Sequence, residues 1–245
     1  MRFKIELELK SERLLLDYRP AIISLFKHSL TIYEDGKHFS SYYEIGKDKM
    51  FTFAVGIPNS KFTKELILVP DKKINIVFST GNIGTGIVFF NALSIQKNKP
   101  YPLANENTMT IKNIIIEKEY PIITDTIDVI FKSPLCVREH NKENNKDTYY
   151  SYEKDGFNEA FKNVLKSQID KSKMLSMSIL DDFQITPIRC KKTVVRHHSQ
   201  FVEATVGSFK FTGNVALLSF LYTNGIGSRK SSGFGLFEIV GGEML

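Results

Sequence analysis

Apolar and polar residues alternate over residues 3–9, where phenylalanine, isoleucine and leucine are separated by charged side chains. This period of two predicts a strand with one buried face. From Pro20 to Gly36 the apolar residues instead recur every three or four positions, which predicts a helix with one apolar stripe and Asp17 as its cap. Because successive residues are about 100° apart on a helix, we expect His28 to lie opposite this stripe and to point away from the core.

The rest of the chain reads as further strands and helices in two successive groups. In the first group the pattern predicts strands at 50–57, 65–69, 74–78 and 108–118, and a helix at 84–96. In the second it predicts an extended segment at 127–137, a polar loop at 139–147, a helix at 157–175, a hairpin of 183–195 with 200–211, a short helix at 214–222 and a last strand at 234–240. Gly207 is predicted as a bulge, because the apolar parity changes around it. We therefore expect an α+β protein of two tandem domains, residues 1–122 and 123–245.

Positive charge is concentrated in one part of the sequence. The 245-residue chain has a formal net charge of +6. Residues 183–235 account for this whole excess, since Glu203 is their only acid and the rest of the chain is balanced. A concentrated basic face attracts a polyanion such as a nucleic-acid backbone, and the alternative is a solvated basic surface.

Four glycines near the C-terminus form the most specific motif. They occur as two glycine–hydrophobic–glycine pairs, with five polar or basic residues between them: Gly225, Gly227, Gly233 and Gly235. Glycine accepts a positive φ and lets a backbone approach a phosphate closely, and exposed N–H groups in such a loop can bind an anion. Arg229 and Lys230 add charge between the pairs. The alternative is a mobile surface loop or a helix C-cap.

This motif resembles the signature of the CRISPR-associated protein 6 family. The segment Gly46–Phe53 is similar to the family's basic and then Phe-Thr-Phe entry into its second strand, and Phe131–Leu135 is similar to its Ser-Pro-hydrophobic element. The resemblance implies two ferredoxin-like domains with a cleft between them. It also implies metal-independent cleavage of precursor CRISPR RNA within each repeat, by attack of a ribose 2′-OH that leaves a 2′,3′-cyclic phosphate and a 5′-hydroxyl.

Such a reaction needs a general base, a general acid and a group that stabilises the charged phosphorane. The resemblance places these groups between the first helix and the second strand, where the chain has His38, His28, Tyr43 and Lys49. We expect His38 to be the principal acid or base, followed by His28, because histidine suits proton transfer near neutral pH. Lys49 is assigned to the phosphate and Tyr43 to an orienting hydrogen bond. For each, the alternative is an ordinary surface residue.

The basic hairpin and the glycine motif are expected to bind the repeat RNA, mainly through phosphates. The predicted RNA-binding residues are Arg189, Lys191, Lys192, Arg196, Gly225, Gly227, Arg229, Lys230, Gly233 and Gly235. His197 and His198 are interpreted as RNA-contacting or merely exposed, and His140 as solvated.

No cofactor and no metal site are expected, since the two cysteines lie far apart and the histidines lack a ligand spacing. A charged N-terminal segment without a signal-peptide core and the lack of a long apolar run predict a cytoplasmic protein without a membrane span. It is expected to be a monomer or homodimer that binds CRISPR repeat RNA and possible further CRISPR subunits. Two other functions stay open: a non-catalytic RNA-binding subunit of a CRISPR interference complex, and an unrelated nucleotide-binding protein using the turn Gly81–Gly86.

Overall fold

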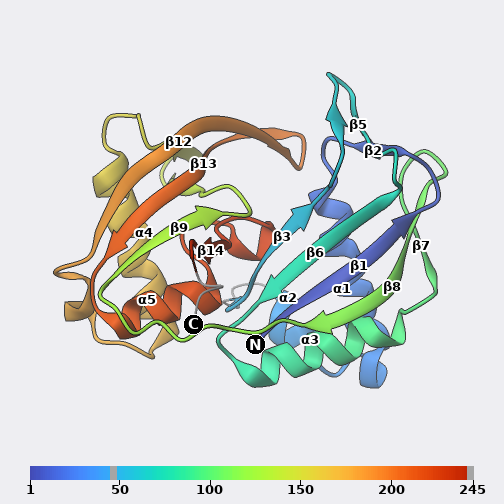
Figure 1. Cartoon of the computed structure of the whole chain (residues 1–245), viewed down its shortest axis with the longest axis horizontal. Coiled ribbons are helices and arrows are strands. Elements are labelled where there is room, and N and C mark those ends of the chain that lie inside the picture. Colours follow the sequence, from blue (N-terminus) through green and yellow to red (C-terminus); the bar gives the residue numbers. More distant parts are fainter. Residues whose placement is uncertain (45–48, 242–245) are drawn as a thin grey trace.

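The computed structural model describes residues 1–44 and 49–241, which form two neighbouring sheets with helices behind them (Figure 1). The first sheet has the order β3-β6-β1-β8-β7. Its strands are β1 (Arg2–Leu9), β3 (Thr52–Gly56), β6 (Lys73–Ser79), β7 (Pro100–Pro102) and β8 (Thr108–Ile116). The helical segments of this part are α1 (Arg19–Ile32), the 3₁₀ turn η1 (Tyr33–Gly36), α2 (Phe39–Tyr43) and α3 (Ile83–Ile95). A small sheet adds β2 (Arg13–Leu15), β4 (Lys61–Phe62) and β5 (Leu66–Leu68).

The second sheet has the order β12-β13-β9-β14. Its strands are β9 (Thr126–Phe131), β12 (Gln184–His197), β13 (Gln200–Thr212) and β14 (Phe237–Ile239). The helical segments here are α4 (Phe157–Ser172), η2 (Met177–Leu180), α5 (Val215–Asn224) and η3 (Lys230–Ser232). A separate hairpin pairs β10 (Val137–Asn141) with β11 (Lys146–Tyr150).

Both sheets follow the same topology. Strand, helix, two strands, helix and strand succeed one another along the chain, and the first strand pairs with the third and the fourth, as β1 does with β6 and β8. In the second sheet β9 pairs with β13 and β14 in the same way. The expected α+β architecture of two tandem ferredoxin-like folds is confirmed.

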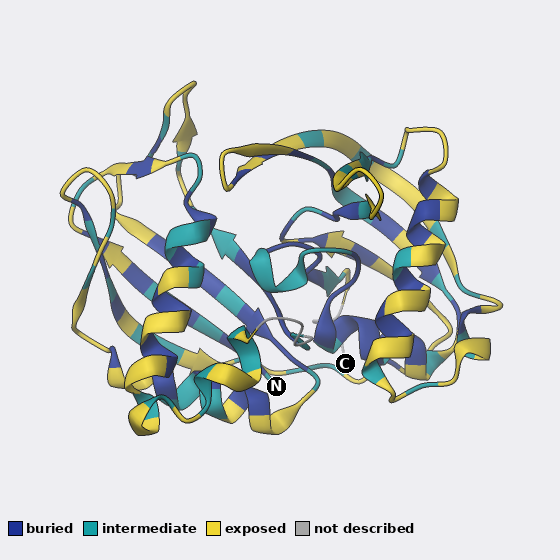
Figure 2. Cartoon of the chain, turned by 180° about the vertical axis from the view of Figure 1, so that it is seen from behind, coloured by how far each residue is buried: buried dark blue, intermediate teal, exposed yellow. Residues whose placement is uncertain are grey.

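Each sheet has its own apolar core between strands and helices, and Figure 2 shows buried residues alternating with exposed ones along the helices and strands. The first core contains buried residues from Phe3 to Ile111, and the second contains residues from Ile122 to Phe237. Met50 nevertheless packs against the second core. The domain boundary between residues 122 and 123 stays a prediction.

Buried polar side chains join the two folds. The guanidinium of Arg2, which is 3% exposed, donates from Nη2 to the carbonyl oxygens of Tyr222 and Phe237. Arg19, which is 7% exposed, donates from Nε to the carbonyl oxygen of Gly233. Because buried carbonyls need donors, these arginines tie α5, Gly233 and β14 to the first fold.

Three sequence predictions are wrong. Asp17 does not cap the first helix, because the N-cap of α1 is Tyr18 and no side chain of the described residues makes a capping hydrogen bond there. Residues 139–147 are not a loop but most of the β10–β11 hairpin, whose polar side chains pair across the strands and so lack an apolar pattern. The bulge lies in β12 at Ile188, since Pro187 pairs with Phe209 while Arg189 pairs with Ser208. Gly207 lies opposite this bulge, where a Cβ would be 2.0 Å from the carbonyl oxygen of Arg189.

Candidate functional site

The glycine-rich loop follows α5 and leads into β14. All four glycines have a positive φ, with values of 72° at Gly225, 93° at Gly227, 84° at Gly233 and 73° at Gly235. All four are buried. A Cβ at Gly233 would lie 2.8 Å from the ring of Phe53, and one at Gly235 only 1.9 Å from the carbonyl oxygen of Ile226. The glycines therefore allow the loop to fold back on itself, rather than exposing backbone to a phosphate.

The polar residues between the glycine pairs are partly exposed, unlike the four glycines. Arg229, in the left-handed conformation at φ 56°, precedes the short 3₁₀ turn η3. The loop is held on the beginning of β10, because the Ser228 N–H donates to the carbonyl oxygen of Cys136 at 2.7 Å. Ser228 Oγ in turn accepts the N–H of Arg138 at 3.2 Å.

A cavity of about 420 Å³ opens beside this loop. Its walls come from the segment before β3, from β10, from α4 and from the loop itself. The charged lining residues are Lys49, Arg138, Glu139, Lys171, Arg229 and Lys230. Basic residues thus outnumber acidic ones among the described residues of the lining, and a cavity of this size and charge suits an anion as large as a nucleotide.

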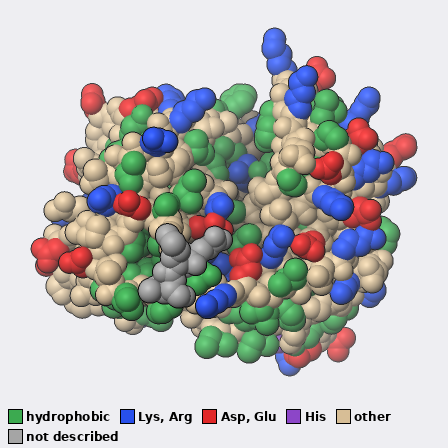
Figure 3. Space-filling model, viewed as in Figure 1, with side chains coloured by type: hydrophobic (Ala, Val, Ile, Leu, Met, Phe, Trp, Pro, Cys, Tyr) green, Lys and Arg blue, Asp and Glu red, His purple; other side chains and the backbone are tan. Residues whose placement is uncertain are grey.

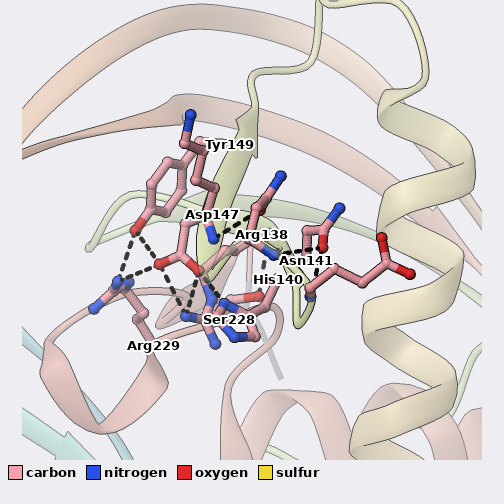
Figure 4. Close-up of polar contacts among 10 residues, drawn as sticks. Arg138, His140, Asn141, Asp147, Tyr149, Ser228 and Arg229 are labelled. Carbon is pink, nitrogen blue, oxygen red and sulfur yellow. Dashed lines mark hydrogen bonds and ion pairs between the residues drawn. The ribbon is translucent and has the colours of Figure 1, made fainter.

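An arginine cluster forms one wall of the cavity (Figure 4). Asp147 on β11 accepts Nη1 of Arg138 with both carboxylate oxygens at 3.0 Å, and Nη2 of Arg229 at 3.0 Å. His140 Nδ1 lies 2.8 Å from the same carboxylate. Burial would raise the pKa of Asp147, but hydrogen bonds from His140, Arg138 and Tyr149 lower it to about 2. The carboxylate therefore stays ionised and holds two cations side by side.

Sequence reasoning missed this cluster. Arg138 and His140 are two positions apart on β10 and so share a face, opposite Tyr149 and Asp147 on β11. The only sequence signal was an Asn-rich turn between two alternating polar segments, which is typical of a hairpin but was interpreted as a loop. His140, expected to be solvated, keeps a 37% exposed side chain and is paired with Asp147.

Two of the four predicted catalytic residues lie at or beside the cavity. Lys49 lines it, and the Lys49 Nζ lies 5.4 Å from the centre of the Tyr43 ring. Lys27 Nζ approaches the same ring at 5.1 Å. Burial raises the pKa of Tyr43, and its hydroxyl makes no hydrogen bond within the described part of the chain. Gly46 and Lys47 of the proposed entry segment lie outside the described residues.

Both predicted catalytic histidines lie outside the cavity lining. His38 precedes α2, where its ring stacks on Tyr33 and its Nε2 lies 3.1 Å from Glu34 Oε2. His28 is exposed on α1 and its ring is 5.2 Å from that of Tyr101 on β7. Because β7 is the edge strand farthest from β3, His28 faces away from the second sheet.

The four basic hairpin residues lie on β12, the edge strand of the second sheet. All four are exposed, but they divide between two faces, because side chains alternate along a strand. Arg189 and Lys191 share one face, while Lys192 and Arg196 share the other, and Lys192 pairs with Glu203 at 3.0 Å. Figure 3 likewise shows lysines and arginines mixed with acids over both halves of this side of the molecule, not one continuous basic patch.

The tip of this hairpin reaches the first fold. The N–H of Ser199 donates to Asp17 Oδ2 at 3.1 Å. His197, expected to be exposed, is only 2% exposed and lies against Phe234 of the glycine-rich loop. Its burial, together with the nearby His198 and Arg229, lowers its pKa to about 4. His197 is therefore neutral at pH 7 and belongs to the packing between hairpin and loop.

In the part of the chain that the structure describes, no three His, Cys, Asp or Glu side chains are placed to hold a metal ion. Within the same residues no helix has the length and apolar character needed to cross a membrane. Of the segment Gly81–Gly86, the last four residues form the first turn of α3, and Asn82 caps this helix by accepting the Thr85 N–H at 2.8 Å.

Known structures share this fold over almost the entire chain. A Cas6-related protein from Pyrococcus furiosus superposes with a TM-score of 0.83 at 17% identity, covering 98% of both chains. A RAMP protein described as binding different RNA substrates gives 0.81 at 18% identity, over 98% of this chain and 99% of that one. A Cas6 product complex gives 0.70 at 14% identity, over 98% and 100%. At such low sequence identities these matches show only that the fold is shared.

Comparison with curated protein sequences finds no match. The family model described as CRISPR associated protein Cas6, C-terminal, matches residues 116–239, which are half of the chain and include the hairpin, α4 and the complete glycine-rich loop. By this match, the chain belongs to the Cas6 family of CRISPR-associated proteins.

Proposed function

We propose that this protein is an endoribonuclease that cleaves precursor CRISPR RNA within the repeat, without a metal ion, by attack of a 2′-OH on the adjacent phosphate. Family membership supports the coarser statement that it processes or binds CRISPR RNA. A product complex and a RAMP protein that binds RNA among the structures of the same fold are in keeping with this function.

The observation that carries the proposal is the basic cavity between the two folds. It brings Lys49, from the segment before β3, next to Arg229 and Lys230 of the glycine-rich loop. A phosphate in this cavity would meet cations from both folds, which is the arrangement that stabilises the extra negative charge of a phosphorane. We assign Lys49 to this task and Tyr43 to orienting it.

Cleavage also needs groups that transfer protons to and from the RNA. We retain His38 as the principal acid or base, because it begins the short helix that ends at Tyr43. His28 ranks lower, since it faces β7. The position of both histidines outside the cavity lining favours a second candidate function, a non-catalytic RNA-binding subunit of a CRISPR interference complex.

Cleavage of a labelled repeat RNA in EDTA tests these two functions. We expect the wild type to cleave it, a substrate with 2′-deoxy at the scissile nucleotide to resist, and Lys49→Ala to cleave at least ~100-fold more slowly. His38→Ala should slow cleavage ~100-fold or more if His38 transfers a proton, whereas His28→Ala should have a small effect. If the wild type binds several cognate repeats tightly but cleaves none of them, the enzyme function is rejected in favour of the non-catalytic RNA-binding subunit.

A further inference from the structure

Asp147 lies behind the cavity, not in it. Arg138 and Arg229 line the cavity, whereas Asp147 is not among its lining residues. The hydrogen bonds of these arginines to Asp147 and Tyr149 use only Nη1 of Arg138 and Nη2 of Arg229. The N–H groups of a guanidinium form a planar fork, and each of these two forks keeps other N–H groups for a ligand. Nε of Arg229, however, is buried and has no partner in the described part of the chain.

The surroundings hold these side chains in one arrangement. Tyr149 donates its hydroxyl to Asp147 at 3.2 Å and accepts Nη2 of Arg229 at 2.6 Å. Their side chains are only partly exposed, at 34% for Arg138, 23% for Arg229 and 20% for Asp147. Ordering a long, flexible arginine costs conformational entropy on binding, and a fork that is already ordered avoids that cost.

The charges around the cavity match a phosphate. The only acidic lining residue among those described, Glu139, accepts the hydroxyl of Tyr150 at 2.9 Å and Nδ2 of Asn163 at 3.3 Å. Positive charge is in excess even when Asp147 and Glu139 are counted, because the cations are Lys49, Lys171, Lys230 and the two arginines. Guanidinium forks bind phosphate oxygens in pairs, which fixes their position as well as their charge.

We propose that Asp147 is a positioning residue that holds Arg138 and Arg229 as a paired fork for one phosphate of the bound RNA. This inference rests on the proposed function, because it takes RNA as the ligand. It adds a phosphate subsite on the β10–β11 side of the cavity, whose lining also includes Lys49.

The direction in which Asp147→Asn changes the affinity for RNA separates this role from its main alternative, a simple counter-charge. If Asp147 were only a counter-charge, then Asp147→Asn would make the cavity more positive and RNA binding tighter. If it positions the two arginines, the same substitution frees them and binding becomes weaker, in spite of the added positive charge. Asp170→Asn is the matched control, since Asp170 lies on α4 with a 65% exposed side chain paired with Lys173.

The experiment measures fluorescence anisotropy of a labelled repeat RNA that carries a 2′-deoxy at the cleavage site, over a series of salt concentrations. We expect Asp147→Asn to bind about tenfold more weakly, and its plot of log K against log salt to be shallower by about 0.7 for one lost phosphate contact. Arg138→Lys and Arg229→Lys keep the charge but lose the fork, and should show a similar loss. The double variant Asp147→Asn with Arg138→Lys should lose less than the sum of the two single losses.

Binding by Asp147→Asn that equals or exceeds that of the wild type would overturn the inference and leave the proposed function intact. Failure of the wild type to bind any repeat RNA would overturn both. Thermal unfolding of each variant shows whether it is folded. Should Asp147→Asn fail to fold, the two Arg→Lys variants decide: wild-type affinity and salt slope in both would reject the subsite.

Discussion

At the residue scale, the glycine-rich loop shows how a sequence signature and its physical cause can differ. The four glycines were predicted to let backbone approach RNA, but they are buried, and their positive φ values are needed for the loop to pack on itself. We therefore propose direct RNA contact for Arg229 and Lys230, which lie between the glycine pairs and line the cavity.

Substitution of one glycine tests this structural role. Gly235→Ala would place a Cβ 1.9 Å from the carbonyl oxygen of Ile226 at a φ of 73°, so the loop must move. We expect a loss of about 3 kcal/mol or more in the free energy of unfolding, measured by urea denaturation. Gly241→Ala is the matched control, because its φ of 84° carries similar strain while none of the residues that the structure describes lies within 4 Å of the added Cβ. Equal losses in both variants would show that backbone strain alone requires the glycine.

At the element scale, the β12–β13 hairpin was predicted correctly in its strands but not in its contacts. Its basic residues divide between two faces, and its tip is docked on the first fold through Ser199 and Asp17. The histidine expected on its surface, His197, is buried against the loop. Alternation along a strand predicts which residues share a face, but not which distant segment covers that face.

The buried histidine makes stability depend on pH. The unfolded chain binds a proton on His197 near pH 6.5, whereas the folded chain binds it only near pH 4. Between these values the unfolded state holds more protons, so the free energy of unfolding falls as the pH is lowered from about 6.5 to about 4. Burial is the main cause of the low pKa of His197. The positive charges of Arg229 and Arg19 lower this pKa further, and the carboxylate of Asp17 opposes them.

Urea denaturation at a series of pH values measures this dependence. His197→Asn should flatten the decline in stability between pH 6.5 and pH 4, since it removes the group that takes up the proton. His28→Asn, at an exposed histidine on α1, should leave the decline as steep as in the wild type. A wild type with constant stability across this interval would contradict the buried, neutral state of His197.

At the scale of the whole molecule, the two folds are held together by buried cations that donate to carbonyl oxygens. Arg2 is part of the first strand and also lies over the ring of Tyr222 at 4.4 Å. Thr52 Oγ1 donates to the carbonyl oxygen of Phe234 at 2.8 Å, so the loop and the first sheet share hydrogen bonds. These contacts hold the folds side by side, and the cavity that carries the proposed function takes lining residues from both.

Removing one of these cations should weaken the whole molecule. Arg2→Met leaves the carbonyl oxygens of Tyr222 and Phe237 buried without this donor, and we expect a loss of about 2–4 kcal/mol in the free energy of unfolding. Arg13→Met, at an exposed arginine on β2, should cost less than about 0.5 kcal/mol. Circular dichroism during thermal unfolding measures both, and similar midpoints for the two variants would contradict the structural role of Arg2.

Alternation and helical spacing by themselves determined the α+β class and the succession of most strands and helices. These are local properties, because the periods of two and 3.6 residues follow from the geometry of the backbone. The same patterns could not reveal β10 and β11, since a hairpin of polar residues carries no apolar period.

Only the tertiary structure decided which charged residues meet. Asp147 and Arg229 are far apart in sequence, but Asp147 Oδ2 and Arg229 Nη2 lie 3.0 Å apart in the folded chain. Lys49 reaches the cavity that Arg229 lines from the other fold. It also placed His28 and His38 outside that cavity, although they lie in the segment where catalytic groups were expected. The physical reason is that a binding site depends on distances between segments, which are set by the packing of two complete cores and not by the local order of residues.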